Sequence, residues 1–250
     1  MRKALLGMAI LTFWIAPACA DEQSDGLAII DKAIKAVGGD AKAAQLQTVK
    51  LKLQGKIKEN DAEKGSVTAD LTLQGFDKFR IDLQLEEEGQ QKSVLLVFQG
   101  NQGWAKKPDK TEPAPQEIVP ILQQVCYAAR MPQMLAALKD KEFHFSPAGE
   151  LKIGDHDAIG VRITHKDHRD VTLYFDKATN LPIKCETRFP DPSGQEKELE
   201  FNYGDYKDFD GIKHCQKFFG KGEGGKFQFE MEVSDVKPQE KLGDDVFAMP

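Results

Sequence analysis

The sequence predicts a mainly β protein with few helices, built as one strongly curved antiparallel sheet that forms an incomplete β-barrel. Three observations support this prediction. From about Gly149 to Pro250, short runs of alternating apolar and polar residues follow one another between tight polar turns, and the same pattern fills residues 49–85. Only two stretches have helical spacing or composition. Period-two alternation is typical of strands with one dry face, and a long sheet must cover that face.

The N-terminus, Met1 to Ala20, has the features of a secretory signal peptide. Arg2 and Lys3 precede an apolar core, and Ala18-Cys19-Ala20 places small residues before Asp21, which predicts cleavage after Ala20. The rival interpretation makes Cys19 a lipidated N-terminus. Because the Leu common three residues before such a Cys is missing, the sequence favours cleavage. We therefore expect an exported, periplasmic protein with one domain over residues 21–250.

The mature chain begins with a helix and continues as sheet. Leu27, Ile30, Ile34 and Val37 recur at helical spacing over residues 24–37, and a further short turn is expected over residues 40–46. Strands follow where apolar and polar residues alternate, and Val94–Phe98 is a continuous apolar run that indicates burial on both sides. The alternating runs are Val49–Ile57, Val67–Leu73 and Phe79–Leu85.

A loop and a helical insert separate the two strand-rich regions. Residues 106–115 are rich in proline and charge and predict a mobile loop after Trp104. Residues 117–139 are helical in composition, and Pro120 and Pro132 divide them into two short helices. The sheet resumes at Phe143. The expected order is a helix, about four or five strands, the insert, and about six strands.

A sheet of about ten strands must curl. The first helix and the insert are predicted to lie over its concave side as a lid. Because two or three short helices cannot fill so wide an apolar surface, we expect a cavity there, and cavities in barrel mouths bind ligands.

Charge and cysteine content exclude several classes of function. Loss of Arg2 and Lys3 would change the formal charge from −6 to −8, and no basic patch suggests nucleic acid. No later apolar run is long enough to span a membrane. Cys126, Cys185 and Cys215 are too few for a disulfide framework. In a meander Cys185 and Cys215 lie two strands apart, about 10 Å, which is too far for a bridge.

Few residues suggest chemistry, and we predict no catalytic residue, metal or cofactor. His165 and His168 have a spacing that a metal could use, but a solvated turn is favoured. Asp155-His156-Asp157 could orient a base for a hydrolase, but no Gly-x-Ser-x-Gly motif supplies a nucleophile. Cys126 lies among apolar residues of the insert and is interpreted as a buried thiol.

Three places in the sequence resemble the LolA-like periplasmic carriers, the outer-membrane lipoprotein-sorting family. An aromatic residue and an Arg open a strand, a turn leads into an aromatic residue, and a closing block ends the chain, so the resemblance covers residues 48–250. Asn101 and Asp77 depart from the family's usual Asp and Pro, and the Arg that these carriers use inside the cavity is not placed. The matching segments are Phe76–Ile81, Gln99–Trp104, Leu173–Asp176, Leu181–Lys184, Tyr206–Ile212 and Val246–Pro250.

The resemblance implies a monomeric, non-enzymatic carrier that holds lipid or lipoprotein acyl chains in an apolar half-barrel cavity. An envelope protein is a possible further partner. The alternative is an envelope sensor or protein-interaction module of the same fold without lipid transport. For the lining residues the alternative is that they pack a solid core. The residues expected to line the cavity are Leu71, Leu73, Phe79, Ile81, Leu83, Val97 and Trp104.

Overall fold

The computed structural model describes residues 18–87 and 89–250. Most of the predicted signal peptide therefore lies outside the described residues, and its cleavage stays a prediction. The first helix begins earlier than the sequence indicated, at Ala18, and the short second helix matches the expectation. The helices are α1 (Ala18–Val37), α2 (Asp40–Gln45) and α3 (Val119–Arg130), with 3-10 turns η1 (Met131–Gln133), η2 (Ala137–Lys139), η3 (Glu223–Gly225) and η4 (Asp244–Phe247).

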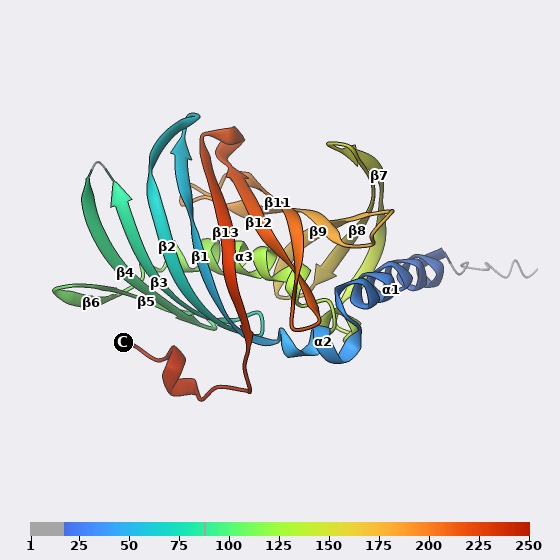
Figure 1. The fold of residues 1–250 in the computed structure, drawn as a ribbon, viewed down its shortest axis with the longest axis horizontal. Coiled ribbons are helices and arrows are strands. Elements are labelled where there is room, and N and C mark those ends of the chain that lie inside the picture. Colours follow the sequence, from blue (N-terminus) through green and yellow to red (C-terminus); the bar gives the residue numbers. More distant parts are fainter. Residues whose placement is uncertain (1–17, 88) are drawn as a thin grey trace, which may run out of the picture.

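The described residues form one antiparallel sheet of thirteen strands in the order β6-β5-β4-β3-β2-β1-β13-β12-β11-β10-β9-β8-β7. Its ends, β6 and β7, do not pair, so the sheet curves without closing (Figure 1). This confirms the predicted incomplete barrel. The strands are β1 (Thr48–Glu59), β2 (Ala62–Gln74), β3 (Lys78–Glu87), β4 (Gln90–Gln99), β5 (Gln102–Lys107), β6 (Lys110–Pro113), β7 (His144–Ile153), β8 (His156–His165), β9 (His168–Asp176), β10 (Pro182–Pro190), β11 (Glu196–Phe209), β12 (Ile212–Gly222) and β13 (Phe227–Pro238).

Across β1–β3 the strand register aligns apolar residues with apolar residues and polar residues with polar residues, so one face of this part of the sheet is apolar and the other is polar. Leu51 pairs with Leu71, and Leu71 pairs with Ile81, so one apolar row crosses three strands. The neighbouring row is charged, and Lys52 Nζ lies 3.0 Å from Asp70 Oδ1. We call the side on which α3 packs the inner face and the opposite side the outer face.

The helices cover the inner face of the curved sheet. Helix α1 lies against β7 at Gly26, where a Cβ atom would collide with the Phe145 side chain. Helix α3 contacts both halves of the sheet. Val119 packs with the core of β1–β4, whereas Tyr127 and Ala128 pack with the core of β8–β12. Figure 1 shows α3 in the hollow of the curved sheet, with α1 and α2 at one end.

The insert and the loop before it differ from the prediction in part. Residues 106–115 are not an irregular loop, because β5 and β6 pair from Trp104 to Pro113 as an edge hairpin. Pro120 lies in the first turn of α3 instead of dividing the insert, since a missing N–H is tolerated there. Pro132 does separate α3 from the short turns that follow it, as predicted.

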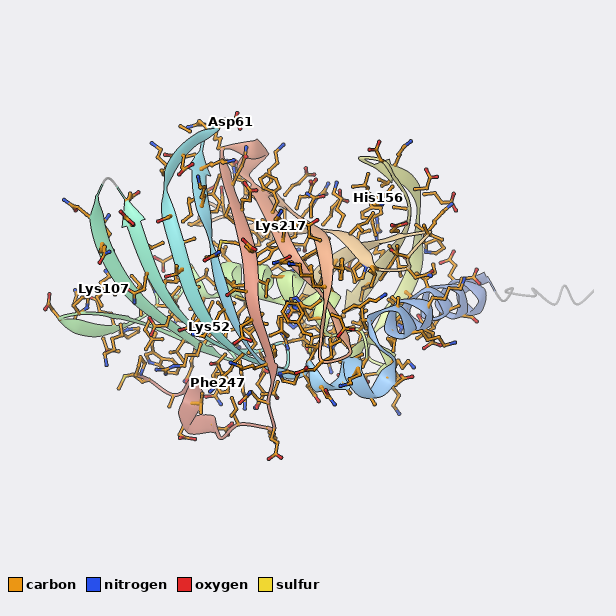
Figure 2. All side chains as sticks on the ribbon, in the orientation of Figure 1. Lys52, Asp61, Lys107, His156, Lys217 and Phe247 are labelled. Atoms are coloured by element: carbon orange, nitrogen blue, oxygen red, sulfur yellow. The ribbon has the colours of Figure 1, made fainter. Side chains whose placement is uncertain are left out.

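The C-terminal segment, residues 239–250, forms a strap across the outer face of β1–β6. Lys78 Nζ lies 2.6 Å from Asp244 Oδ1, Arg80 donates to the Val246 carbonyl oxygen, and Thr111 donates to the carbonyl oxygen of Pro250. Phe247, on η4, is fully buried beneath β3 and β4 (Figure 2). The strap therefore fixes this half of the sheet from outside.

Cys126, Cys185 and Cys215 are free thiols. Cys185 lies on β10 and Cys215 on β12, two strands apart as predicted. Burial raises the pKa of Cys126 and of Cys215 to about 12. The thiols are therefore protonated at neutral pH, which fits packing and not nucleophilic chemistry.

Candidate functional site

An apolar surface on the inner face of β2–β4 becomes less buried from one end of these strands to the other. Next to the β2–β3 turn, Leu73, Phe79 and Phe98 form a buried row, each at most 3 % exposed. The next rows are aliphatic as far as Leu83 and Val94, and their members on β3 and β4 are half-buried, whereas Lys92 pairs with Leu85 in the last row. We call the half-buried members that pack against the buried core of β1–β4 the apolar strip: Leu71, Ile81, Leu83, Leu85 and Leu96.

Helix α3 lies mainly against β9 and β10 and reaches the core of β1–β4 through a few side chains. Leu122 and Cys126 of α3 pack against the same core as the strip and are themselves half-buried. Phe218 of β12 and Phe229 of β13 are half-buried too, and they contact both cores. The two rings and α3 therefore lie at the boundary between the two cores, and the strip belongs to the core on one side of that boundary.

The structure divides the seven predicted lining residues between the two faces. Five lie together on the inner face, where Leu73 and Phe79 are buried and Leu71, Ile81 and Leu83 belong to the strip. Whether they contact a ligand stays a prediction.

Val97 and Trp104 are not brought together with those five. They pair with each other on the outer face, in the row of Arg80, beneath the strap. The continuous run Val94–Phe98 was the signal that both faces of β4 are covered, but its register could not be known from the sequence.

Sequence reasoning missed Leu85, Leu96 and the contributions of α3. Leu85 was within the predicted strand, and its alternation with Leu83 could have included it. Leu122 and Phe229 come from distant segments, and no local pattern joins them to β2–β4.

Helix α3 is anchored to the sheet by Arg130, an arginine that is 2 % exposed. Its guanidinium donates to the carbonyl oxygens of Leu46 (2.9 Å), Gln47 (3.3 Å) and Gly75 (3.3 Å). No carboxylate of the described chain pairs with it, and burial lowers the pKa of Arg130 to about 9. It also donates to Gln133 Oε1 (2.6 Å) and to Met134 Sδ (3.1 Å). The side chain therefore stays charged at neutral pH and is held by uncharged acceptors.

Gln124 and Tyr127 anchor the same helix to the other half of the sheet. The Gln124 amide donates to the Arg169 carbonyl oxygen and accepts from the Arg169 N–H, as a neighbouring strand would. It also donates to Thr187 Oγ1 at 2.8 Å. Tyr127 stacks on His168 with a centroid distance of 3.7 Å. Its buried hydroxyl has no hydrogen-bond partner within the part of the chain that the structure describes. The directional hydrogen bonds of Gln124 fix the orientation of α3 as well as its position.

The two histidines considered for metal binding form part of an aromatic cluster. Their ring centroids lie 5.5 Å apart, and His168 faces Tyr127 while His165 faces Phe143 at 5.0 Å. Within residues 18–87 and 89–250 no group of three metal-ligating side chains occurs. Burial, followed by the charge of His165, lowers the pKa of His168 to about 4, so this ring is neutral at pH 7.

His156 contacts a carboxylate, but not either of its sequence neighbours. Its Nδ1 lies 3.0 Å from Asp176 Oδ2, and Asp176 also accepts from the Ala178 N–H at 2.7 Å. His156 is exposed, and Asp176 stabilises the turn between β9 and β10. Among the described residues no hydroxyl or thiol contacts the imidazole, so the arrangement offers no support for the hydrolase hypothesis.

A polar trough of about 1120 Å³ crosses the outer face of β8–β12. One row of residues forms its floor, and Arg162 on β8 and Lys221 on β12 are the two ends of that row. Its charges are largely paired, with Lys184 lying 2.7 Å from Glu200. The trough is separate from the apolar strip, which lies on the other face of the sheet.

The described chain contains no helix that is long and apolar enough to cross a membrane. Neither a protein-family model nor the sequence of a curated protein matches the chain.

Solved structures are similar to it over nearly its whole length. A LolA superfamily protein from Nitrosomonas europaea has a TM-score of 0.56 and 16% identity, over 89% of this chain and 97% of that chain. A putative outer-membrane lipoprotein-sorting protein domain from Vibrio parahaemolyticus has a TM-score of 0.56 and 14% identity, over 90% of this chain and 97% of that chain. A DUF1329 family protein from Desulfovibrio piger has a TM-score of 0.54 and 12% identity, over 91% of this chain and 97% of that chain. The chain has a LolA-like fold, which is what the resemblance in sequence implied.

Proposed function

We propose that this protein is an exported, non-enzymatic carrier that holds lipid or lipoprotein acyl chains on the apolar strip, beneath α3. The observation that carries this proposal is the aliphatic surface of the strip on β2–β4, which stays half-buried although its neighbours Leu73, Phe79 and Phe98 are buried. A fold does not specify a function by itself, whereas an apolar surface of this kind can bind hydrocarbon.

The physical basis of the proposal is the cost of hydrocarbon in water. Each methylene group that leaves water contributes about 0.8 kcal/mol. Leu71 pairs with Ile81, and Ile81 pairs with Leu96, so the strip crosses three strands, a width of about 10 Å at ordinary strand spacing. That width suits extended acyl chains, and the strip offers them no charged group.

Helix α3 would act as the lid of this site. Leu122 and Cys126 pack against the same core as the strip, while Arg130 and Gln124 hold the helix through hydrogen bonds to backbone atoms. These bonds can be exchanged for bonds to water when α3 moves, whereas the strip would gain acyl contacts in place of α3. A movement of α3 would therefore admit a chain at a modest net cost in free energy.

Export to the periplasm follows from the predicted signal peptide, and mass spectrometry of the mature N-terminus tests it. An N-terminus at Asp21 would support the proposal. A diacylated Cys19 would instead indicate a membrane-anchored protein of the same fold.

The carrier proposal is tested by extracting lipid from protein purified without detergent from the periplasm. We expect acyl-containing species at a fixed ratio to the protein, and fewer of them from the variant Leu83→Gln. The variant Leu95→Gln is the matched control, because Leu95 is also half-buried but lies on the outer face. Protein that is free of lipid and binds no fatty acid in solution would contradict the proposal.

A second candidate is an envelope sensor or protein-interaction module of the same fold. The polar trough supports it, since a hollow of about 1120 Å³ lined by charged residues suits a polypeptide better than a lipid tail. Pull-down of envelope proteins with wild-type protein and with the double variant Arg162→Glu, Lys221→Glu tests this candidate. Capture by both forms to the same extent would contradict it.

A further inference from the structure

Phe227, the first residue of β13, projects from the end of the β12–β13 hairpin. It is 44% exposed, and among the described residues Met249 is the only other large hydrophobic side chain that is exposed. Its ring lies 6.1 Å from that of Phe229, which is half-buried on the inner face. Phe229 in turn lies 5.8 Å from Phe218. A row of rings therefore leads from solvent to the apolar site.

The hairpin end is held in a defined place. The Asn60 N–H donates to the Lys226 carbonyl oxygen at 2.7 Å, and the Gln228 amide donates to Asp61 Oδ1 at 2.9 Å. These contacts join the hairpin to the β1–β2 turn, which Asp61 marks at the same end of the sheet (Figure 2). The exposure of Phe227 is therefore built into a supported tip and is not the result of a free chain end.

The charges around Phe227 favour an anionic surface. Lys226 is exposed next to Phe227, and Lys221 is exposed on the outer face of the same hairpin end, opposite Glu200; among the described residues neither lysine lies within ion-pair distance of a carboxylate. The segment Lys221–Gln228 contains these two lysines and one acidic residue, Glu223, although the whole chain carries a formal charge of −6. Glu59, which pairs with Phe227 across the strands, forms an ion pair with Lys64 at 3.4 Å. An exposed aromatic ring beside unpaired lysines is the combination that binds the interface of an anionic bilayer.

We propose that the β12–β13 tip docks on a phospholipid bilayer, with Phe227 entering the headgroup region and Lys221 and Lys226 contacting anionic lipid. The inference rests on the proposed function, because docking there would join the membrane to the apolar strip through Phe227, Phe229 and Phe218. An acyl chain could then pass along these rings without crossing water. The exposed tip and the apolar surface behind it together identify a bilayer as the partner.

Sedimentation with vesicles of phosphatidylethanolamine and phosphatidylglycerol tests the docking. Phe227→Ser should lower the partition coefficient about tenfold, because about half of a phenylalanine side chain would no longer leave water. Lys221→Gln and Lys226→Gln should each lower it about fivefold, and only with anionic vesicles. Met249→Ser is the matched control and should leave partition unchanged, since Met249 lies on the strap.

Two further measurements complete the test: the fluorescence of a Trp at position 227 and the binding of fatty acid in solution. Phe227→Trp should retain partition, and its added fluorescence should shift to shorter wavelength on vesicles. Binding of a fluorescent fatty acid in solution, measured on the same variants, separates the two proposals. Phe227→Ser that loses vesicle binding supports docking whether or not fatty acid binds. Wild-type protein that does not sediment with vesicles, or equal losses for Phe227→Ser and Met249→Ser, would overturn docking even if fatty acid binds.

Discussion

Arg130 Nη2 donates a hydrogen bond of 2.9 Å to the carbonyl oxygen of Leu46, which joins the end of α3 to the turn before β1. The same guanidinium binds Gly75 in the β2–β3 turn. One buried cation thus connects the lid to the strands that carry the apolar strip. A buried charge without a carboxylate is costly, so it indicates that the position of α3 matters more than maximum stability.

Arg130→Met should loosen α3 and lower the free energy of unfolding by about 2–4 kcal/mol, because three carbonyl oxygens lose their donor. Urea denaturation measures the loss. Relative to the wild type, amide hydrogen exchange in Arg130→Met should become faster in α3 by more than it does in β8–β11. Arg188→Met is the control, since Arg188 is exposed and pairs only with Glu198. Unchanged exchange in α3 would contradict the anchoring role.

Phe247→Ala should release the strap from the outer face. The ring is fully buried, so its truncation should lower the free energy of unfolding by about 3 kcal/mol. Trp104, on the same face as Val97, should become more exposed, which its fluorescence reports. Met249→Ala should change neither property. If strap release left Trp104 fluorescence unchanged, the assignment of Trp104 to the covered outer face would be wrong.

The fold was largely predictable from the sequence, because a half-buried strand repeats its face every two residues. Val67 to Leu73 and Phe79 to Leu85 show this period without interruption, and both are strands. The edge hairpin β5–β6 was not predictable, since Lys106 to Pro115 has the composition of a loop and gains its structure by pairing with β4.

The candidate site was only partly predictable. Leu71, Ile81 and Leu83 were placed on one face because they share strands with a clear period. Val97 and Trp104 were grouped with them wrongly in space, because their face depends on the register of β4 and on a strap more than a hundred residues away. Arg130 stood out only as a charge within the apolar run Val125 to Met131. Nothing local shows that its partners are backbone carbonyls.

His168 should make stability depend on pH. Burial lowers its pKa to about 4 from about 6.5 in an unfolded chain. Between these values the unfolded chain binds a proton that the folded protein does not, so stability falls as pH falls from about 6.5 and levels off below about 4. His168→Phe keeps a ring against Tyr127 and removes the titration.

The loss of stability between pH 6.5 and 4 should therefore be smaller in His168→Phe by about 1–2 kcal/mol, since the side chain is only half-buried. His214, whose pKa burial also lowers to about 4, leaves part of the dependence in place. Urea denaturation at several pH values measures the difference, with His144→Phe as an exposed control. A variant with the same pH dependence as the wild type would show that His168 is not the responsible group.

Leu83→Gln should weaken fatty-acid binding about tenfold, because a polar amide would replace a half-buried aliphatic group on the strip. Leu95→Gln alters the same residue type on the outer face and should leave binding unchanged. Fluorescence titration with a labelled fatty acid compares the two. Equal losses would indicate a general effect on β3 and β4 instead of a binding surface.

The central claim is that an acyl chain lies on the inner face of β2–β4 beneath α3. The most direct measurement is photo-crosslinking with a fatty acid that carries a diazirine near its tail, followed by peptide mapping. The account predicts attachment to Leu71, Ile81, Leu83, Leu85 or Leu96, and to Leu122 of α3. Attachment confined to the polar trough or to the outer face, or no saturable attachment at all, would contradict it.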